Sequence, residues 1–271
     1  MRKALVILKS MRMLEWREYF ALAIYGYLYA SQFHVEIEKF VMLMISMSAY
    51  MAATYIVNNF YDVESDQLNI NKKSKNPMIE NNLDAKTIFM TTVLLVLMGL
   101  MMIPNLSAFL NYSTMCLLSF LYSTPPVRLK EKPPLDLLSH ILFFGIQPFL
   151  QGVLTVDSPN FSFITGMIAL VGLYSAFLQL RNEWEDYSSD SLAGYKTTAV
   201  IMGLETVEKC LKIMSIMIVI GIFSLIISNI KLILLIILSI IFIPFKNYII
   251  KYKFRILDIL VTVTFIGILL S

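Results

Sequence analysis

The chain has 271 residues, of which 58% are hydrophobic and 15% are charged, against about 25% charged residues in typical soluble domains. With a mean hydropathy of +0.71 it has too little polar surface to cover a water-soluble globule of 31.0 kDa, and intrinsic disorder is excluded for the same reason. The net charge of +3 gives no sign of nucleic-acid binding, and Cys116 and Cys210 lack metal-ligand spacing. The composition therefore predicts an integral membrane protein.

The first seventeen residues differ from the rest of the chain. Apolar Leu5, Leu8 and Met11 alternate with basic Lys3 and Lys9, and the apolar stretch is too short for a signal peptide. We expect residues 1–17 to form an amphipathic segment that lies on the cytoplasmic membrane surface.

Clusters of Pro, Asn, Asp, Lys and Ser divide the remainder into apolar runs near the ~20 residues that a helix needs to cross a bilayer. Continuous apolar runs without in-and-out alternation favour helices over a β-barrel. The predicted fold class is all-α, a polytopic membrane protein with one domain over residues 1–271. The nine expected transmembrane helices are 19–33, 40–57, 87–103, 107–123, 137–156, 162–180, 213–229, 232–245 and 256–270.

The basic residues test this topology. The segment before the first span and the connections after spans two, four, six and eight carry every Lys and Arg except Lys39 and Lys231. Because loops that stay in the cytoplasm carry the excess of Lys and Arg, the amino terminus and these connections are expected to be cytoplasmic.

Acidic residues gather on the same face, after the second and sixth spans. Asn58, Asp62 and Asp66 recur at four-residue intervals, as do Asp186 and Asp190, so on helices each set shares one face. Like charges at this spacing repel by a few tenths of a kcal/mol even in water. Since Mg²⁺ takes one or two carboxylates and completes its shell with water and phosphate oxygens, we expect these five side chains to be metal ligands.

Other polar residues within the spans have less specific patterns. His34 and His140 have no partner at metal-ligand spacing, so a zinc site is not expected and both are interpreted as structural. Gln147, Gln151 and Gln179 either face a cavity or join helices, and their sequence context favours neither.

Basic side chains near the acids suit an anionic ligand, because fixed Lys and Arg residues beside Mg²⁺ stabilise a leaving diphosphate. Each of them has an equally good explanation as an ordinary cytoplasmic loop residue. The candidate diphosphate-binding residues are Lys72, Lys75, Arg128, Lys130, Lys196, Asn58 and Tyr122.

At these residues the sequence resembles the UbiA superfamily of membrane prenyltransferases. The first family motif is matched by Asn58, Asn59, Asp62 and Asp66; the second by Asp186, Asp190, Gly194 and Thr197; a third recurring segment by residues 122–130. Two positions depart from the family pattern. Asn59 stands where Asp is usual, which removes a charge and leaves an oxygen donor. Lys75-Asn76-Pro77 stands where the family has Arg-Pro, and that arginine's role is assigned to Lys75 or Lys72.

The resemblance implies Mg²⁺-dependent transfer of an isoprenyl chain from its diphosphate to a lipophilic acceptor, through an allylic carbocation. In this interpretation the catalytic residues are Asp62, Asp66, Asp186, Asp190 and Lys130. The active site is expected at the cytoplasmic face of a multi-pass protein of the cell membrane.

Several alternatives remain open. A cyclase or lyase would ionise the same diphosphate without an external acceptor. A transporter is disfavoured because few ionisable residues lie in the middle of spans. A quinone precursor, an ether lipid and a carotenoid are all candidate acceptors. The sequence from Asn182 to Asp190 resembles naphthoate- or carotenoid-modifying family members somewhat more than hydroxybenzoate-modifying ones. The sequence leaves the prenyl chain length and the oligomeric state open.

Overall fold

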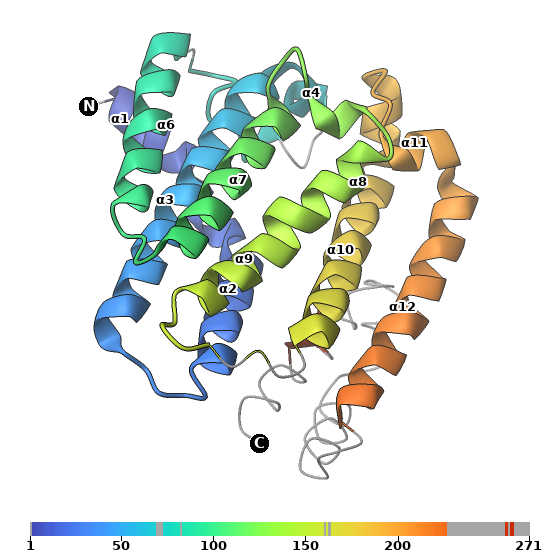
Figure 1. Ribbon diagram of the computed structural model, residues 1–271. Helices are drawn as coiled ribbons and strands as arrows, with labels where there is room; N and C mark the ends of the chain where they lie inside the picture. The colour runs from blue at the N-terminus through green and yellow to red at the C-terminus, as the bar shows by residue number, and fades with distance from the viewer. Residues whose placement is uncertain are drawn as a thin grey trace.

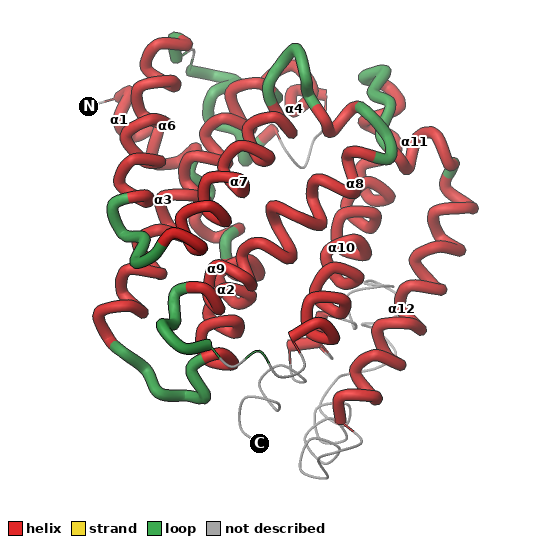
Figure 2. Tube along the Cα trace, viewed as in Figure 1, coloured by secondary structure: helices red, strands yellow, loops and turns green. Residues whose placement is uncertain are grey.

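The computed structural model describes residues 2–68, 73–81, 83–159, 161, 164–226, 258–259 and 261–262. Within these residues all regular structure is helical and there is no strand (Figures 1 and 2). The α-helices are α1 (Arg2–Ser10), α2 (Arg17–Ala30), α3 (Ile37–Tyr61), α4 (Val63–Leu68), α6 (Ala85–Leu100), α7 (Leu106–Ser123), α8 (Leu135–His140), α9 (Gln147–Leu154), α10 (Ile164–Leu192), α11 (Thr198–Met202) and α12 (Leu204–Ile226). Two 3₁₀ turns, η1 (Met13–Glu15) and η2 (Leu129–Glu131), and a π-helical stretch, η3 (Ile141–Ile146), complete the set.

The first seven predicted spans each fall on helical segments, namely α2, α3, α6, α7, the run from α8 through α9, α10 and α12. Three helical segments of the described chain, Ile37–Tyr61, Leu135–Leu154 and Ile164–Leu192, are long and apolar enough by themselves to cross a membrane. The expected spans 232–245 and 256–270 lie outside the described residues, apart from residues 258–259 and 261–262. The all-helical class is thus confirmed, whereas the count of nine spans stays a prediction.

The helices extend through both acidic motifs, as the four-residue spacing requires. Helix α10 continues twelve residues past the predicted span to Leu192, so Asp186 and Asp190 lie one turn apart on it. Helix α3 ends at Tyr61, but Asp62 N donates to Asn58 O at 3.0 Å and Asp66 N to Asp62 O at 2.8 Å. Helix α4 therefore continues the spacing of α3 across the break.

The amino-terminal segment forms α1 followed by η1. Val6 is buried with Ile56 and Met78, whereas Leu5 and Leu8 are about half exposed (54% and 50%). An apolar surface left outside the protein suits contact with lipid. The placement of α1 on a membrane surface stays a prediction.

Helices α2 and α9 cross at very short range because glycine stands at the crossing. A Cβ on Gly152 would lie 1.9 Å from the carbonyl oxygen of Ala23, and one on Gly26 would lie 2.1 Å from that of Phe149. Small residues of this kind let membrane helices approach until their backbones touch.

Polar side chains join the helices. Asn111 Nδ2 of α7 donates to Gln151 Oε1 of α9 at 2.9 Å, and Gln147 Nε2 donates to Thr114 Oγ1 at 2.8 Å. Gln179 Nε2 of α10 donates to the Tyr122 hydroxyl of α7 at 3.0 Å. All three glutamines thus link helices.

Two ionic contacts join segments that are far apart in the sequence. Lys39, near the start of α3, pairs with Asp157 after α9. Within α10, the buried Arg181 Nη1 contacts both oxygens of Asp258 at 2.9 and 2.8 Å, and the Tyr174 hydroxyl donates to Asp258 Oδ1 at 2.8 Å. The second contact holds residue 258, which lies in the ninth predicted span, against α10.

The close crossing of α2 and α9 predicts that Gly152→Ala destabilises the protein by about 1–3 kcal/mol, since the added methyl group forces the two backbones apart. Thermal unfolding in detergent measures the effect. Gly166→Ala is the matched control, because a Cβ there has no atom within 4 Å. The control should be neutral or slightly stabilising, and an equal loss in both variants would contradict the assignment.

Candidate functional site

The carboxyl-terminal ends of α3, α7 and α10 lie at the same end of the bundle, where α4 packs beside α10 (Figure 1). The turn after α7 leads into η2 and carries Arg128 and Lys130. The three sequence motifs therefore meet at one end of the bundle, as the topology predicts.

Asp62 is the centre of this cluster. It is 8% exposed and forms an ion pair with Lys130, while Arg128 Nη2 lies 3.5 Å from its Oδ1 atom. Asn58 Nδ2 donates to Asp62 Oδ2 at 2.8 Å and also to Ser123 Oγ of α7 at 3.2 Å. Two cations thus compensate one nearly buried carboxylate, which is otherwise costly to desolvate.

The backbone of the turn after α7 directs both cations to Asp62. Arg128 adopts a left-handed conformation with φ of 41°, an uncommon geometry for a residue with a side chain. Its N–H donates to Thr124 O at 2.8 Å, and η2 begins directly after it. This reversal places Arg128 and Lys130 on the same side of the turn.

Tyr195 links Arg128 to the second acidic motif, and it is not among the residues predicted from the sequence. Its hydroxyl accepts from Arg128 Nη2 at 3.1 Å, the Arg128 guanidinium lies 5.5 Å from its ring centroid, and its N–H donates to Asp190 O at 2.9 Å. Gly194, with φ of +75°, lies two residues after the end of α10 and allows the chain to turn there. Burial raises the pKa of the Tyr195 phenol, so the hydroxyl stays neutral near pH 7. The only sequence signal was its position directly after the motif glycine.

Asp66 is held by an asparagine. It is 4% exposed, and its Oδ2 atom accepts from Asn76 Nδ2 at 2.9 Å. Asn59, the motif position that departs from the family pattern, is fully buried and donates through Nδ2 to the Ser10 carbonyl of α1 at 2.8 Å. The amide group of Asn59 therefore bonds α1, a contact that the motif pattern does not predict.

Two further acids at this end have a structural partner. Asp136 accepts from the Thr198 N–H and the Thr198 hydroxyl, both at 2.6 Å, and Glu183 Oε2 accepts from Ala199 N at 3.1 Å. Both carboxylates thus lie at the amino terminus of α11, where backbone N–H groups have no helical partner. In the sequence, Glu183 is part of the second acidic cluster, but in the structure it accepts a hydrogen bond at the amino terminus of α11.

The other candidate cations are dispersed. Lys75 Nζ lies 2.9 Å from Glu15 Oε1 of η1, and Lys196 is exposed. Although partial burial acts to raise the pKa of Glu15, the nearby Lys75 and Arg12 charges outweigh that effect and lower it. Lys72 lies outside the described residues. The structure thus brings Arg128 and Lys130 to Asp62 and places Lys75 in a contact with η1.

Aromatic side chains lie next to the polar cluster on the bundle side. Tyr122 precedes Ser123, and its ring centroid is 5.1 Å from that of Phe143. Phe144 stacks on Tyr19 at 4.3 Å and lies 6.4 Å from Tyr55. His140 is buried against Phe144 at 4.9 Å, which supports its interpretation as structural.

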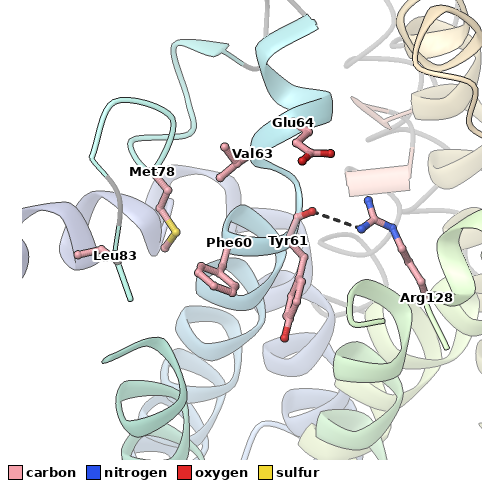
Figure 3. Close-up of a pocket in the computed structure, with 7 residues that line it drawn as sticks. All are labelled: Phe60, Tyr61, Val63, Glu64, Met78, Leu83 and Arg128. Atoms are coloured by element: carbon pink, nitrogen blue, oxygen red, sulfur yellow. Dashed lines mark hydrogen bonds between the residues drawn. The ribbon is translucent and has the colours of Figure 1, made fainter. Parts of the chain in front are cut away.

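A cavity of about 320 Å³ opens beside Arg128 (Figure 3). In the close-up, the Glu64 and Arg128 side chains lie on one side, and the Arg128 guanidinium bonds the Tyr61 carbonyl at 3.4 Å. Apolar side chains form the opposite wall. The lining residues are Phe60, Tyr61, Val63, Glu64, Met78, Leu83 and Arg128.

The acids fit Mg²⁺ in their chemistry. Within the described chain no three His, Cys, Asp or Glu side chains are grouped closely enough to hold a metal ion. Mg²⁺ needs fewer, since one or two carboxylates suffice when water and phosphate oxygens complete its shell. The pairs Asp62/Asp66 and Asp186/Asp190 lie on or beside the packed helices α4 and α10. This donor set suits a metal shared with an anionic ligand.

Comparisons with known proteins identify the family. The UbiA prenyltransferase family matches residues 19–258. Two similar proteins are named digeranylgeranylglyceryl phosphate synthase. The one from Sulfurisphaera tokodaii is 25% identical over 204 residues, or 73% of this chain and 70% of the relative, and the one from Saccharolobus solfataricus is 25% identical over 203 residues, or 73% and 69%.

Solved structures share the fold. A UbiA homologue from Archaeoglobus fulgidus bound to GPP and Mg²⁺ superposes with a TM-score of 0.73 at 19% identity, covering 97% of this chain and 99% of that one. A structure of digeranylgeranylglyceryl phosphate synthase superposes with a TM-score of 0.73 at 20% identity, covering 100% and 98%. From the family match, the apolar helices and this shared fold, the chain is an integral membrane protein that belongs to the UbiA prenyltransferase family.

Proposed function

We propose that this prenyltransferase moves an isoprenyl chain from its diphosphate to a glycerol-phosphate ether lipid, with Mg²⁺ at the cluster around Asp62. The observation that carries the proposal is the meeting of both acidic motifs with Arg128 and Lys130 at one end of an apolar bundle. A substrate with an anionic head and an apolar tail matches this division of polar and apolar surface.

The proposed metal ligands are Asn58, Asp62, Asp66, Asp186 and Asp190. When bound, Mg²⁺ would supply the positive charge that stabilises a departing diphosphate. Lys130 and Arg128 would bind the diphosphate oxygens, since both cations already converge on one carboxylate oxygen. Tyr122 and Lys196 are assigned supporting contacts. Lys72 and Lys75 would attract the anion to the cytoplasmic face.

The reaction would begin with cleavage of the allylic C–O bond, whose electron pair leaves with the diphosphate. The allylic cation would then face the aromatic side chains around Phe144 and Tyr122, whose electron-rich faces attract cations. An acceptor oxygen would donate a lone pair to the allylic carbon, and its hydroxyl proton would pass to an oxygen of the released diphosphate. The aromatic side chains also exclude water, which would otherwise capture the cation.

The acceptor class is proposed from the relatives. Both similar proteins named above are, by name, synthases of digeranylgeranylglyceryl phosphate, a lipid that carries a phosphate, so their product is anionic. Exposed basic residues at the site end, Lys73, Lys132 and Lys196, favour an anionic acceptor over an uncharged one. The carotenoid and quinone-precursor acceptors, and the cyclase without an acceptor, become the comparison arms of the test.

The site predicts that Asp62→Ala and Asp190→Ala each reduce turnover below detection while the protein remains folded. Each variant removes one of the carboxylates proposed to hold the metal against the diphosphate. Diphosphate release by purified protein in nanodiscs measures turnover, and thermal unfolding reports the fold. Asp157→Ala removes an acid at the opposite end of the bundle and should leave turnover intact. Retained activity in both site variants would reject the site.

Asp136 should behave differently from Asp62, because its hydrogen-bond partners are the backbone and side chain of Thr198. Asp136→Ala should lower stability by about 1.5–3 kcal/mol, the typical value of hydrogen bonds to a charged group. Thermal unfolding measures this. At a temperature where the variant is folded, turnover should stay measurable, and a complete loss with unchanged stability would place Asp136 in the reaction instead.

The acceptor is tested with Mg²⁺ and geranylgeranyl diphosphate against a panel: geranylgeranylglyceryl phosphate, a dihydroxynaphthoate, a hydroxybenzoate, a carotenoid and no acceptor. We expect stoichiometric product only with the glyceryl phosphate lipid. Diphosphate release with a cyclised product in the arm without an acceptor would instead favour the cyclase.

A further inference from the structure

Three asparagine and aspartate side chains connect α1 to the acidic cluster through buried hydrogen bonds. Asn59 Nδ2 donates to the carbonyl of Ser10, the last residue of α1, at 2.8 Å. Asn76 Nδ2 donates to the Asn59 carbonyl at 2.8 Å and to Asp66 Oδ2 at 2.9 Å. All four residues are at most 4% exposed.

The amides satisfy groups that helix geometry leaves without a partner. The last carbonyls of a helix have no intrahelical donor, and Ser10 and Asn59 lie in the last turns of α1 and α3. An aspartate at position 59 would present only acceptor oxygens to the Ser10 carbonyl, so the interaction requires the amide. The other amide atom, Asn59 Oδ1, is buried and has no hydrogen-bond partner within the described chain.

Asn76 also fixes the wall of the neighbouring cavity. Its Oδ1 atom accepts from Met78 N at 3.1 Å, and Met78 lines the cavity beside Tyr61 and Arg128 (Figure 3). One side-chain amide therefore holds a carboxylate, the end of α3 and a cavity-lining segment at once.

We propose that Asn76 is a positioning residue for Asp66 and that Asn59 extends this network to α1, so that ligand binding at Asp66 and docking of α1 stabilise each other. The coupling rests on the proposed function, because it assumes that Asp66 holds Mg²⁺ against a diphosphate. By linkage, a ligand that orders Asp66 also orders Asn76, Asn59 and the end of α1. The order of α1, within the amphipathic amino-terminal segment, then depends on whether a ligand is bound at Asp66.

The test measures hydrogen exchange of the backbone amides in α1, with and without Mg²⁺ and inorganic pyrophosphate. In the wild type these ligands should slow exchange in α1. In Asn59→Ala and Asn76→Ala this protection should be lost. Asn81→Ala is the matched control, since Asn81 donates to the Pro77 carbonyl at 3.0 Å in the same loop and should behave as the wild type. No protection in the wild type, or equal behaviour of all variants, would overturn the coupling.

Kinetics separate positioning from a purely structural role. Asn76→Ala should raise the Mg²⁺ concentration at half-maximal rate roughly tenfold with a much smaller change in kcat, as for other residues that orient a metal ligand. Asn59→Asp should also weaken Mg²⁺ and speed exchange in α1. Tighter Mg²⁺ binding in Asn59→Asp with unchanged exchange would make residue 59 a direct ligand and reject the network.

Exchange requires neither an acceptor nor turnover, so the two proposals fail in different ways. Wild-type protein that gains protection from Mg²⁺ and pyrophosphate but transfers no prenyl group would reject the proposed function alone. Wild-type protein that transfers the group without protection of α1 would reject the coupling alone.

Discussion

Carboxylates at the end of an apolar bundle repel one another unless positive charge lies between them, and this constraint organises the site. Asp62 meets it with Lys130 and Arg128, which converge on one of its oxygens. Both cations come from a short turn whose left-handed residue reverses the chain at the end of α7. Arg128 also donates to the Tyr195 hydroxyl, and Tyr195 N donates to Asp190 O, so one cation connects the first motif to the residue that bonds the second.

The acids at this end separate into two groups by what they accept. Asp136 and Glu183 accept from the amino terminus of α11, so the protein itself satisfies them and they hold the cap in place. In the first motif, Asp62 pairs with the flexible side chain of Lys130, and Asp66 accepts from the Asn76 amide. A lysine can move to a diphosphate oxygen without unfolding a helix, whereas the amides of α11 cannot leave theirs. This difference supports the proposal that the motif aspartates, and not Asp136 or Glu183, take part in the reaction.

Much of the fold was accessible from the sequence, since apolar runs interrupted by polar clusters predict helices and the first seven spans coincide with them. The four-residue spacing of the acids also held, because hydrogen bonds continue from Asn58 to Asp66. What the pattern did not predict are contacts to backbone atoms. Tyr195, Asn76 and the Asn59–Ser10 bond all depend on where a carbonyl or amide group lies in space. Every residue has such groups, so no residue type marks them.

The two positions that depart from the family pattern explain each other once they are seen together. Relative to the family pattern, Asn59 replaces an aspartate and Asn76 replaces an arginine. In the fold, the Asn76 amide bonds the Asn59 carbonyl, and neither side chain carries charge. An arginine at position 76 beside Asn59 would lack the carboxylate that the family pattern has at position 59. An aspartate at position 59 would have no donor for the Ser10 carbonyl. Relative to that pattern, the two amides remove one charge of each sign, so the sum of the formal charges at these two positions is unchanged, and the amides hydrogen-bond the Ser10 carbonyl, the Asn59 carbonyl and Asp66.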